Sequence, residues 1–232
     1  MSMTQTSSAT APGTKCWSCG ATTGSNHFCA ACGKIQPLPR GTSYFAFFAL
    51  PEKLQIDPEA LEQQFHKLSW KLHPDNFMRA DEFERNLSLE RSSELNDAYR
   101  ALRDPLTRVE YLLAHKSMRK EGAAKQQAPP ELLEEVFELN ESLDELRQAR
   151  AAGEDLAALR ARLESAEQDF QEKLEGLDAE LDQVRTEWDA AIVANANEAD
   201  RGKVLARMNE ILNRRSYIRN LVASVAKELA DA

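Results

Sequence analysis

Two short motifs contain the residues best suited to chemistry in this chain of 232 residues. The first is a pair of Cys-x-x-Cys sequences, whose members are Cys16, Cys19, Cys29 and Cys32. Four thiolates at this spacing can close a tetrahedral shell around a metal ion, and the glycine after each pair allows the tight turn that the shell requires. We therefore predict a structural metal site, with zinc favoured ahead of iron.

The placement of the cysteines argues against other uses of the thiols. All four lie between positions 16 and 32, so they form one local site and leave the rest of the protein without disulfides. Two disulfides are disfavoured in a cytosolic chain, and a redox-active dithiol is expected in βαβ surroundings that this sequence lacks. A metal-sensing or thiol-redox protein stays the alternative, which tight stoichiometric zinc would exclude.

The second motif is the tripeptide His73-Pro74-Asp75, which lies between two predicted helices. The first helix has one apolar stripe at steps of three and four residues, formed by Leu61, Phe65, Leu68 and Leu72. It must stop near His73, because a proline removes a backbone donor and disfavours helical geometry in the residue before it. A second helix with a matching face follows, made of Leu95, Ala98, Tyr99 and Leu102. The two helices predict an αα-hairpin with the tripeptide in its exposed connection.

Neither motif indicates an enzyme active site. His73 and Asp75 could serve as an acid–base pair, but no nucleophile, oxyanion donor or apolar pocket is indicated nearby. A closed four-thiolate site has no open position for a substrate. We therefore predict that the protein has no catalytic residues of its own.

The composition favours helices throughout. The chain has only 9 Gly and 9 Pro, and it is rich in Ala, Leu, Glu and Arg, which lose little rotamer freedom in a helix. The net charge of −9 is concentrated in residues 131–200, where it would repel a phosphate backbone, so we expect no nucleic-acid partner. No apolar run approaches the roughly 20 residues that a membrane span requires, so we expect no membrane association.

The pattern along the chain predicts five segments. They are a disordered tail, a four-cysteine metal module with its linker, the helical hairpin, a second linker and a three-helix bundle, at residues 1–15, 16–40, 41–120, 121–130 and 131–232. Apolar seams at steps of three and four residues place the bundle helices near 131–152, 156–192 and 199–230. The tail has a single Lys and no Arg, which argues against a transit peptide. We therefore expect the bacterial cytoplasm in preference to the mitochondrial matrix.

Residues 44 to about 115 resemble the J-domain, in which an HPD loop joins helices II and III. In J-domains this loop and the basic face of helix II dock onto a DnaK-type ATPase and stimulate its ATP hydrolysis. The resemblance assigns that role here to His73, Pro74 and Asp75, together with Lys67 and Lys71. The two lysines are one helical turn apart and share a face near the loop. Without the tripeptide they would indicate only a solvated helix surface.

Over residues 44–229 the chain is similar to the HscB family, in which a J-domain precedes a helical bundle. The stretches that indicate this family are Tyr44-Phe45, residues 95–99 (LNDAY) and residues 104–113 (DPLTRVEYLL). The resemblance implies an all-α, L-shaped protein that couples a DnaK/HscA-type chaperone to the iron–sulfur scaffold IscU. The cysteine module is similar to that of animal mitochondrial members, whereas many bacterial members lack it. A general protein-folding co-chaperone with another client is the alternative.

In HscB proteins the scaffold is held by an apolar and acidic patch on the first bundle helix, with an aromatic residue from the last. The matching residues here are Leu133, Phe137, Glu138, Glu141, Glu145 and Tyr217. Spacing adds that Leu133 and Phe137 fall beside the core seam, with the acids on the same flank, which suits a partner surface. The alternative is that these two side chains widen the core stripe. The sequence leaves open whether the bundle forms a homodimer.

Overall fold

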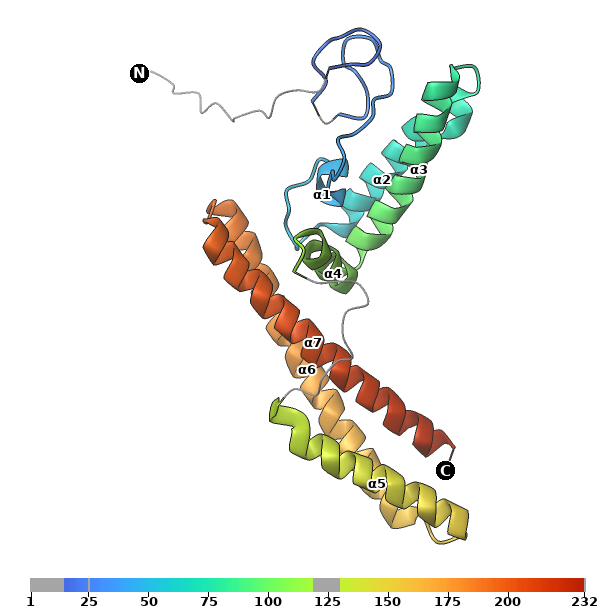
Figure 1. Cartoon of the computed structure of the whole chain (residues 1–232), viewed down its shortest axis with the longest axis vertical. Helices are drawn as coiled ribbons and strands as arrows, with labels where there is room; N and C mark the ends of the chain where they lie inside the picture. Colours follow the sequence, from blue (N-terminus) through green and yellow to red (C-terminus); the bar gives the residue numbers. More distant parts are fainter. Residues whose placement is uncertain (1–14, 25, 119–129, 232) are drawn as a thin grey trace. The chain divides into compact units, whose positions relative to one another are not determined.

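The structure, a computed structural model, describes residues 15–24, 26–118 and 130–231. Within these ranges it contains seven α-helices and two short 3-10 helices, and its only β-structure is two isolated bridges near the cysteines (Figure 1). The prediction of an all-α protein is therefore confirmed. None of the helices in the described ranges combines the length and apolar character that crossing a membrane requires. The predicted disordered tail and the predicted linker at 121–130 fall almost wholly outside the described residues.

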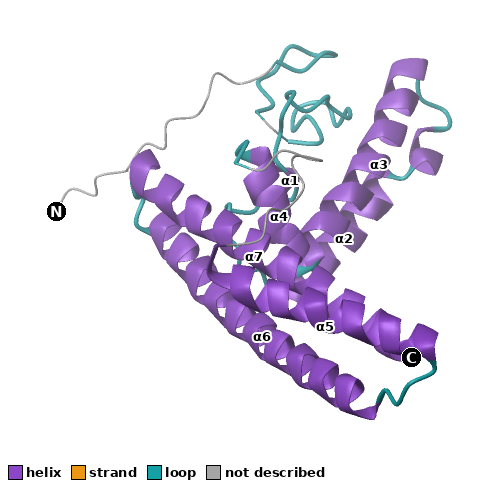
Figure 2. Cartoon of the chain, turned by 60° about the horizontal axis from the view of Figure 1, so that its bottom comes forward, coloured by secondary structure: helices purple, strands orange, loops and turns teal. Residues whose placement is uncertain are grey.

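The chain forms two compact units, residues 1–111 and 112–232, with the boundary inside α4. The helices of the first unit, including the start of α4, are α1 (Tyr44–Phe47), α2 (Pro58–Leu72), the 3-10 helix η1 (Pro74–Phe77), α3 (Glu82–Arg103) and α4 (Pro105–His115). Those that lie wholly in the second unit are the 3-10 helix η2 (Pro130–Leu132), α5 (Leu133–Ala152), α6 (Ala157–Val193) and α7 (Glu198–Ala230), which Figure 2 shows with the loops between them.

Local sequence signals explain where α2 begins and ends. The Asp57 side chain accepts hydrogen bonds from the amides of Glu59 and Ala60, and Pro58 occupies the first helical position, where its missing N–H is not needed. At the other end, His73 has left the helical region with φ −58° and ψ 131°. This is the conformation that a following proline imposes, so the predicted stop near His73 is confirmed.

α2 and α3 pack as the predicted hairpin (Figure 1). Both faces of the contact are buried, with Leu61, Leu68 and Leu72 on α2 and Leu95, Ala98 and Leu102 on α3. The rings of Phe65 and Tyr99 stack across the pair, with their centroids 4.2 Å apart. Burying each of the leucines contributes about 1.5–3 kcal/mol, so this face supplies most of the force that holds the hairpin together.

Arg108 joins the end of α3 to the beginning of α4. Its buried guanidinium donates hydrogen bonds to the carbonyl oxygens of Leu102 at 2.6 Å, Arg103 at 3.4 Å and Leu54. Carbonyls in the last turn of a helix have no intrahelical partner, and Pro105 has no amide to offer them. Arg108 therefore satisfies groups that would otherwise be buried without a hydrogen bond.

In the second unit, α6 and α7 form a long antiparallel pair (Figure 1). Their shared seam is apolar and buried, and includes Leu163, Phe170, Leu177, Leu181, Val184 and Trp188 from α6 with Leu205, Met208, Leu212, Ile218 and Val225 from α7. The Asn197 side chain caps α7 by accepting from the amide of Asp200 at 2.9 Å. These helices agree closely with the predicted ranges.

α5 is much shorter than its neighbours, with 20 residues against 37 in α6 and 33 in α7. At a rise of 1.5 Å per residue it spans about 30 Å, whereas α6 spans about 55 Å. Ion pairs join α5 to α6 between Glu135 and Lys173 and between Glu145 and Arg162. The bundle therefore has three helices only beside the N-terminal half of α6. α5 begins at Leu133, slightly later than predicted, because residues 130–132 form a 3-10 turn.

We predict that Arg108→Met lowers the free energy of unfolding by about 3 kcal/mol, because hydrogen bonds to a charged donor are lost and buried carbonyls are left unsatisfied. Calorimetric unfolding would measure the change. Arg100→Met is the matched control, since the contacts of Arg100, with Asp97 at 2.8 Å and the Asn96 carbonyl at 3.3 Å, are exposed on the helix surface. The control should shift stability by no more than about 0.5 kcal/mol. Equal effects of the two substitutions would contradict the role given to Arg108.

Candidate functional site

The HPD tripeptide forms an exposed and locally ordered turn at the end of α2. The His73 and Asp75 side chains are 55% and 78% exposed, and the His73 Nδ1 atom lies 3.5 Å from a carboxylate oxygen of Asp75. The His73 ring also accepts a hydrogen bond from the Asp75 amide at 3.3 Å. Asn76 ties the turn back to α2 by donating to the Trp70 carbonyl at 2.6 Å. Such a turn can present side chains to a partner, but it encloses no substrate.

Two serines on α3 fix the point from which the turn departs. The hydroxyl of Ser88, which is fully buried, donates to the Leu72 carbonyl at 2.7 Å, and that of Ser92 donates to the same oxygen at 2.9 Å. This carbonyl belongs to the last residue of α2, where no amide of the helix can reach it. Both serines escaped the sequence analysis. Their signal was a polar pair one turn apart on the face of α3 that should have been apolar.

The α2 surface beside the turn is both basic and aromatic. Lys67 and Lys71 are exposed on one side of the helix, as their spacing predicted. Trp70 lies beside Lys67, on the side of the helix away from Lys71, and is 75% exposed, which is unusual for a large apolar side chain. This tryptophan was not among the predicted contact residues, although its position off the Leu61/Leu68/Leu72 stripe and one turn after Lys67 could have indicated it.

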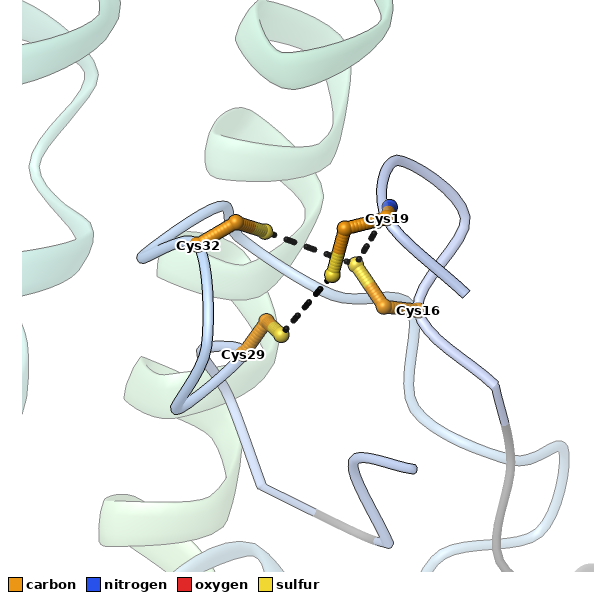
Figure 3. A group of neighbouring side chains, drawn as sticks. All are labelled: Cys16, Cys19, Cys29 and Cys32. Atoms are coloured by element: carbon orange, nitrogen blue, oxygen red, sulfur yellow. Dashed lines mark hydrogen bonds between the residues drawn. The ribbon is translucent and has the colours of Figure 1, made fainter. Parts of the chain in front are cut away.

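The four cysteine thiols converge, as Figure 3 shows. Their sulfur atoms all lie within 4.8 Å of one another, with Cys16 and Cys32 3.6 Å apart and Cys19 and Cys29 3.7 Å apart. A tetrahedral zinc site with Zn–S bonds of about 2.3 Å places its sulfurs about 3.8 Å from one another. The distances therefore fit a single metal ion bound by four thiolates.

The two Cys-x-x-Cys turns have the same backbone design. The amide of Gly20 donates to the Cys16 carbonyl at 3.0 Å, and that of Gly33 donates to the Cys29 carbonyl at 2.9 Å. Both glycines have positive φ, +73° and +72°, which a residue with a side chain adopts only with strain. The amides of Ser18 and Cys19 each lie 3.4 Å from the Cys16 sulfur, where they favour a thiolate.

The close approach of the four thiols gives them different pKa values. Burial raises the pKa of Cys16, but hydrogen bonds from the amides of Cys19 and Ser18 and from neighbouring thiols outweigh it and lower the pKa to about 6. The Lys34 amide favours ionisation of Cys32, yet burial and the surrounding thiols raise its pKa to about 12. Four thiolates this close repel one another, and a bound dication removes that repulsion.

The predicted scaffold-binding residues lie on the second unit. Leu133 and Phe137 are 55% and 70% exposed, so they do not widen the core stripe of α5. Tyr217 is half-buried on α7, and its neighbour Ile218 lines the same hollow as Leu132. The structure therefore brings the start of α5, next to Leu133, and the middle of α7, next to Tyr217, to one corner of the bundle.

The three predicted acids do not all lie beside this corner. Glu141 is exposed on the same side of α5 as Phe137, one turn further along the helix. Glu138 lines a groove between α5 and α6, whose floor includes Leu139, Ala166 and Phe170. Glu145 pairs with Arg162 of α6 at 3.3 Å. The three carboxylates therefore lie at different angles around α5, from its exposed face to the side that meets α6.

The chain is similar to several bacterial proteins named co-chaperone protein HscB homolog. That of Vibrio vulnificus strain YJ016 is 32% identical over 170 residues, which make up 73% of this chain and 94% of the relative. That of Vibrio cholerae strain N16961 is 31% identical over the same length and with the same coverage. The crystal structure of human co-chaperone protein HscB has a TM-score of 0.57 at 22% identity, over 93% of this chain and 98% of the other. No protein-family model matches the chain.

A helical hairpin with an exposed HPD turn, followed by a helical bundle, defines a J-domain co-chaperone. The Vibrio relatives, matched over nearly their whole length, show that the chain belongs to the HscB family of co-chaperones. The family expected from residues 44–229 is thus confirmed, and the human structure supports the fold.

We predict that the double substitution Ser88→Ala with Ser92→Ala loosens the HPD turn. The Leu72 carbonyl would lose both donors, which should cost about 1–3 kcal/mol. Amide hydrogen exchange across residues 73–77 should become faster than in the unaltered protein. Ser93→Ala, which removes an exposed hydroxyl from the same helix, is the control and should leave exchange unchanged. Unaltered exchange in the double variant would show that the serines do not hold the turn.

Proposed function

We propose that this protein is a co-chaperone of iron–sulfur cluster assembly, which stimulates ATP hydrolysis by a DnaK/HscA-type chaperone and delivers an IscU-type scaffold to it. The observation that carries the proposal is the exposed HPD turn, held at the end of α2 by two hydrogen bonds from α3 serines to the Leu72 carbonyl. Membership of the HscB family supports the client. The protein then contributes two binding events and no bond chemistry, and its compartment would be the cytoplasm.

The chaperone would contact the HPD turn and the adjoining face of α2. His73, Pro74 and Asp75 offer a rigid turn with an exposed imidazole and carboxylate, and Lys67 and Lys71 add positive charge beside it. Exposed charges are weak stabilisers of their own protein but effective in guiding a complementary partner. Trp70 extends this surface with an aromatic side chain of the type that dominates binding hot spots.

The scaffold would contact Leu133 and Phe137 of α5 and Tyr217 of α7. Leu133 and Phe137 are exposed apolar side chains, for which the folded chain alone gives no reason. Glu141 would border Phe137 with negative charge, and Glu138 and Glu145 would extend that charge towards α6, where it attracts a basic client surface. The four thiolates would bind Zn²⁺ as a structural ion, since a closed tetrahedral set of sulfurs suits zinc and leaves no position for catalysis.

The decisive measurement is the steady-state ATPase rate of a cognate DnaK-type chaperone with this protein, with and without the scaffold. Synergy between the two is the expected result. We predict that Asp75→Asn abolishes stimulation while leaving scaffold binding intact, because the turn and the bundle belong to separate units. Asp97→Asn, the same change at a partly exposed α3 residue, is the control. Stimulation that ignores the scaffold would indicate a co-chaperone with another client, and no stimulation would refute both.

We predict that Phe137→Ala weakens scaffold binding by about 2 kcal/mol, roughly 30-fold in Kd, as expected for an exposed aromatic anchor. Isothermal titration with the purified scaffold would measure it. Val193→Ala removes another exposed apolar side chain from the same unit, at the end of α6, and should leave affinity unchanged. Both variants should keep the thermal stability of the parent, because neither side chain is buried. Equal affinities for the two variants would place the scaffold elsewhere.

A further inference from the structure

The cysteine module, residues 15–38, is docked on the J-domain rather than merely joined to it. Both belong to the same compact unit, and the contacts connect residues that are 20 to 66 positions apart in the chain. The module meets the J-domain at two places, the first turn of α3 and the end of α1. Each of these contacts starts from a residue next to, or within two positions of, a cysteine.

The first Cys-x-x-Cys turn contributes Trp17. Its ring meets that of Phe83, in the first turn of α3, edge to face with centroids 4.9 Å apart and an angle of 69°. The indole N–H donates to the Ile35 carbonyl at 2.7 Å, which holds the ring across the second half of the module. Trp17 therefore links the two halves of the metal site to each other and to α3.

The second turn contributes Lys34, two residues after Cys32. Its ammonium group forms an ion pair with the carboxylate of Glu84, the neighbour of Phe83, and lies 6.0 Å from the Trp17 ring centroid. The Glu84 side chain is only 5% exposed, so this is not an ordinary surface pair. A carboxylate removed from water in this way depends on its partner much more strongly than an exposed one.

His27, two residues before Cys29, makes the third contact. One ring nitrogen lies 2.8 Å from the Phe47 carbonyl at the end of α1, and the imidazole meets the Phe47 ring at 4.5 Å between centroids. Phe47 and Ile35 are both buried. The module is therefore fixed to α1 and to α3 by different parts of its chain.

These contacts require the closed form of the module. Its described residues contain two isolated bridges and no helix or strand, and its buried apolar side chains are few. A segment of this size does not hold a core without a metal or a disulfide. Metal binding would therefore supply the folding energy that places Trp17, His27 and Lys34 on one docking surface.

The docking point lies close to the HPD turn. η1 ends at Phe77, and only residues 78–81 separate it from α3. Ser88, which holds the Leu72 carbonyl, lies about one turn after Glu84 on the same helix. A continuous series of contacts thus runs from the cysteines through Phe83 and Glu84 to the residue that precedes His73.

We infer that the metal-bound cysteine module is a brace for the J-domain, so that metal occupancy and the order of the HPD end of α3 are thermodynamically linked. Linkage is reciprocal: if metal binding orders the start of α3, then weakening the docking contacts on α3 must weaken metal binding. This consequence separates a brace from an independent metal knuckle, whose affinity would not depend on α3. It rests on the proposed zinc site but involves no partner protein, so its failure would leave the proposed co-chaperone role untouched.

The first test is zinc affinity of the full chain, measured by competition with a chromophoric chelator. Phe83→Ala, which changes no cysteine and lies far along the chain, should raise the Kd for zinc about tenfold. Leu89→Ala removes another exposed apolar side chain from α3 and is the control, with unchanged Kd expected. Equal zinc affinity in Phe83→Ala, Leu89→Ala and the parent would overturn the inference.

The second test follows amide hydrogen exchange in zinc-loaded and zinc-free protein. Removal of zinc should accelerate exchange at residues 73–88, and leave α6 and α7 unchanged. Should Phe83→Ala fold poorly, a double-mutant cycle with Glu84→Gln and Lys34→Met gives a second test, because these substitutions remove the ion pair with little change in side-chain size. The effect of Lys34→Met on zinc affinity should shrink in the Glu84→Gln background. Full additivity of the two substitutions, or identical exchange with and without zinc, would show that the module does not brace the J-domain.

Discussion

The carbonyl oxygen of Leu72 is the group on which the arrangement of the J-domain depends. Pro74 forces α2 to end at this residue, and a helix end leaves its last carbonyls without partners. Ser88 and Ser92 of α3 supply the two missing donors from across the hairpin. The sequence feature that terminates one helix therefore also dictates polar residues on the apolar face of the other. Because both serine bonds converge on the residue before His73, the exposed turn starts from a fixed point.

The apolar periodicity of the sequence predicted the helices well, because the side chains that pack on one face of a helix must recur every three or four residues. The stripe of Leu61, Leu68 and Leu72 is buried, and the proline stop near His73 is observed. The long seam on α6, from Leu163 to Trp188, likewise follows steps of three and four residues. The sequence also indicated a metal site, since four cysteines at two-residue spacings have few other uses. For the proposed scaffold surface it indicated a flank of α5 together with Tyr217, and the structure shows that the acids of this flank spread towards α6.

The sequence did not reveal contacts between residues that are distant in the chain and that belong to no repeating pattern. Ser88 and Ser92 stand out as polar residues on the apolar face of α3, but their acceptor, the Leu72 carbonyl, is known only once α2 is placed opposite them. The pairing of Trp17 with Phe83, and of Lys34 with Glu84, crosses from an irregular segment to a helix. No spacing rule connects such residues. The shortness of α5 relative to its partners was visible, but its consequence, a bundle with three helices at one end only, required the packing to be known.

Each unit exposes large apolar side chains, but the helices that carry them are packed to different extents. Trp70 lies on a helix whose opposite face is buried against α3, so its exposure does not weaken the hairpin. Leu133 and Phe137 lie at the start of the short helix α5, where an ion pair and a limited apolar seam attach it to α6, whereas its second half is also tied to Glu228 of α7. A segment with few neighbours opens at a lower free-energy cost than the core does. The start of α5 can therefore open more easily than α3, which Ser88 ties to the end of α2 and whose own last turn is held by Arg108 from α4.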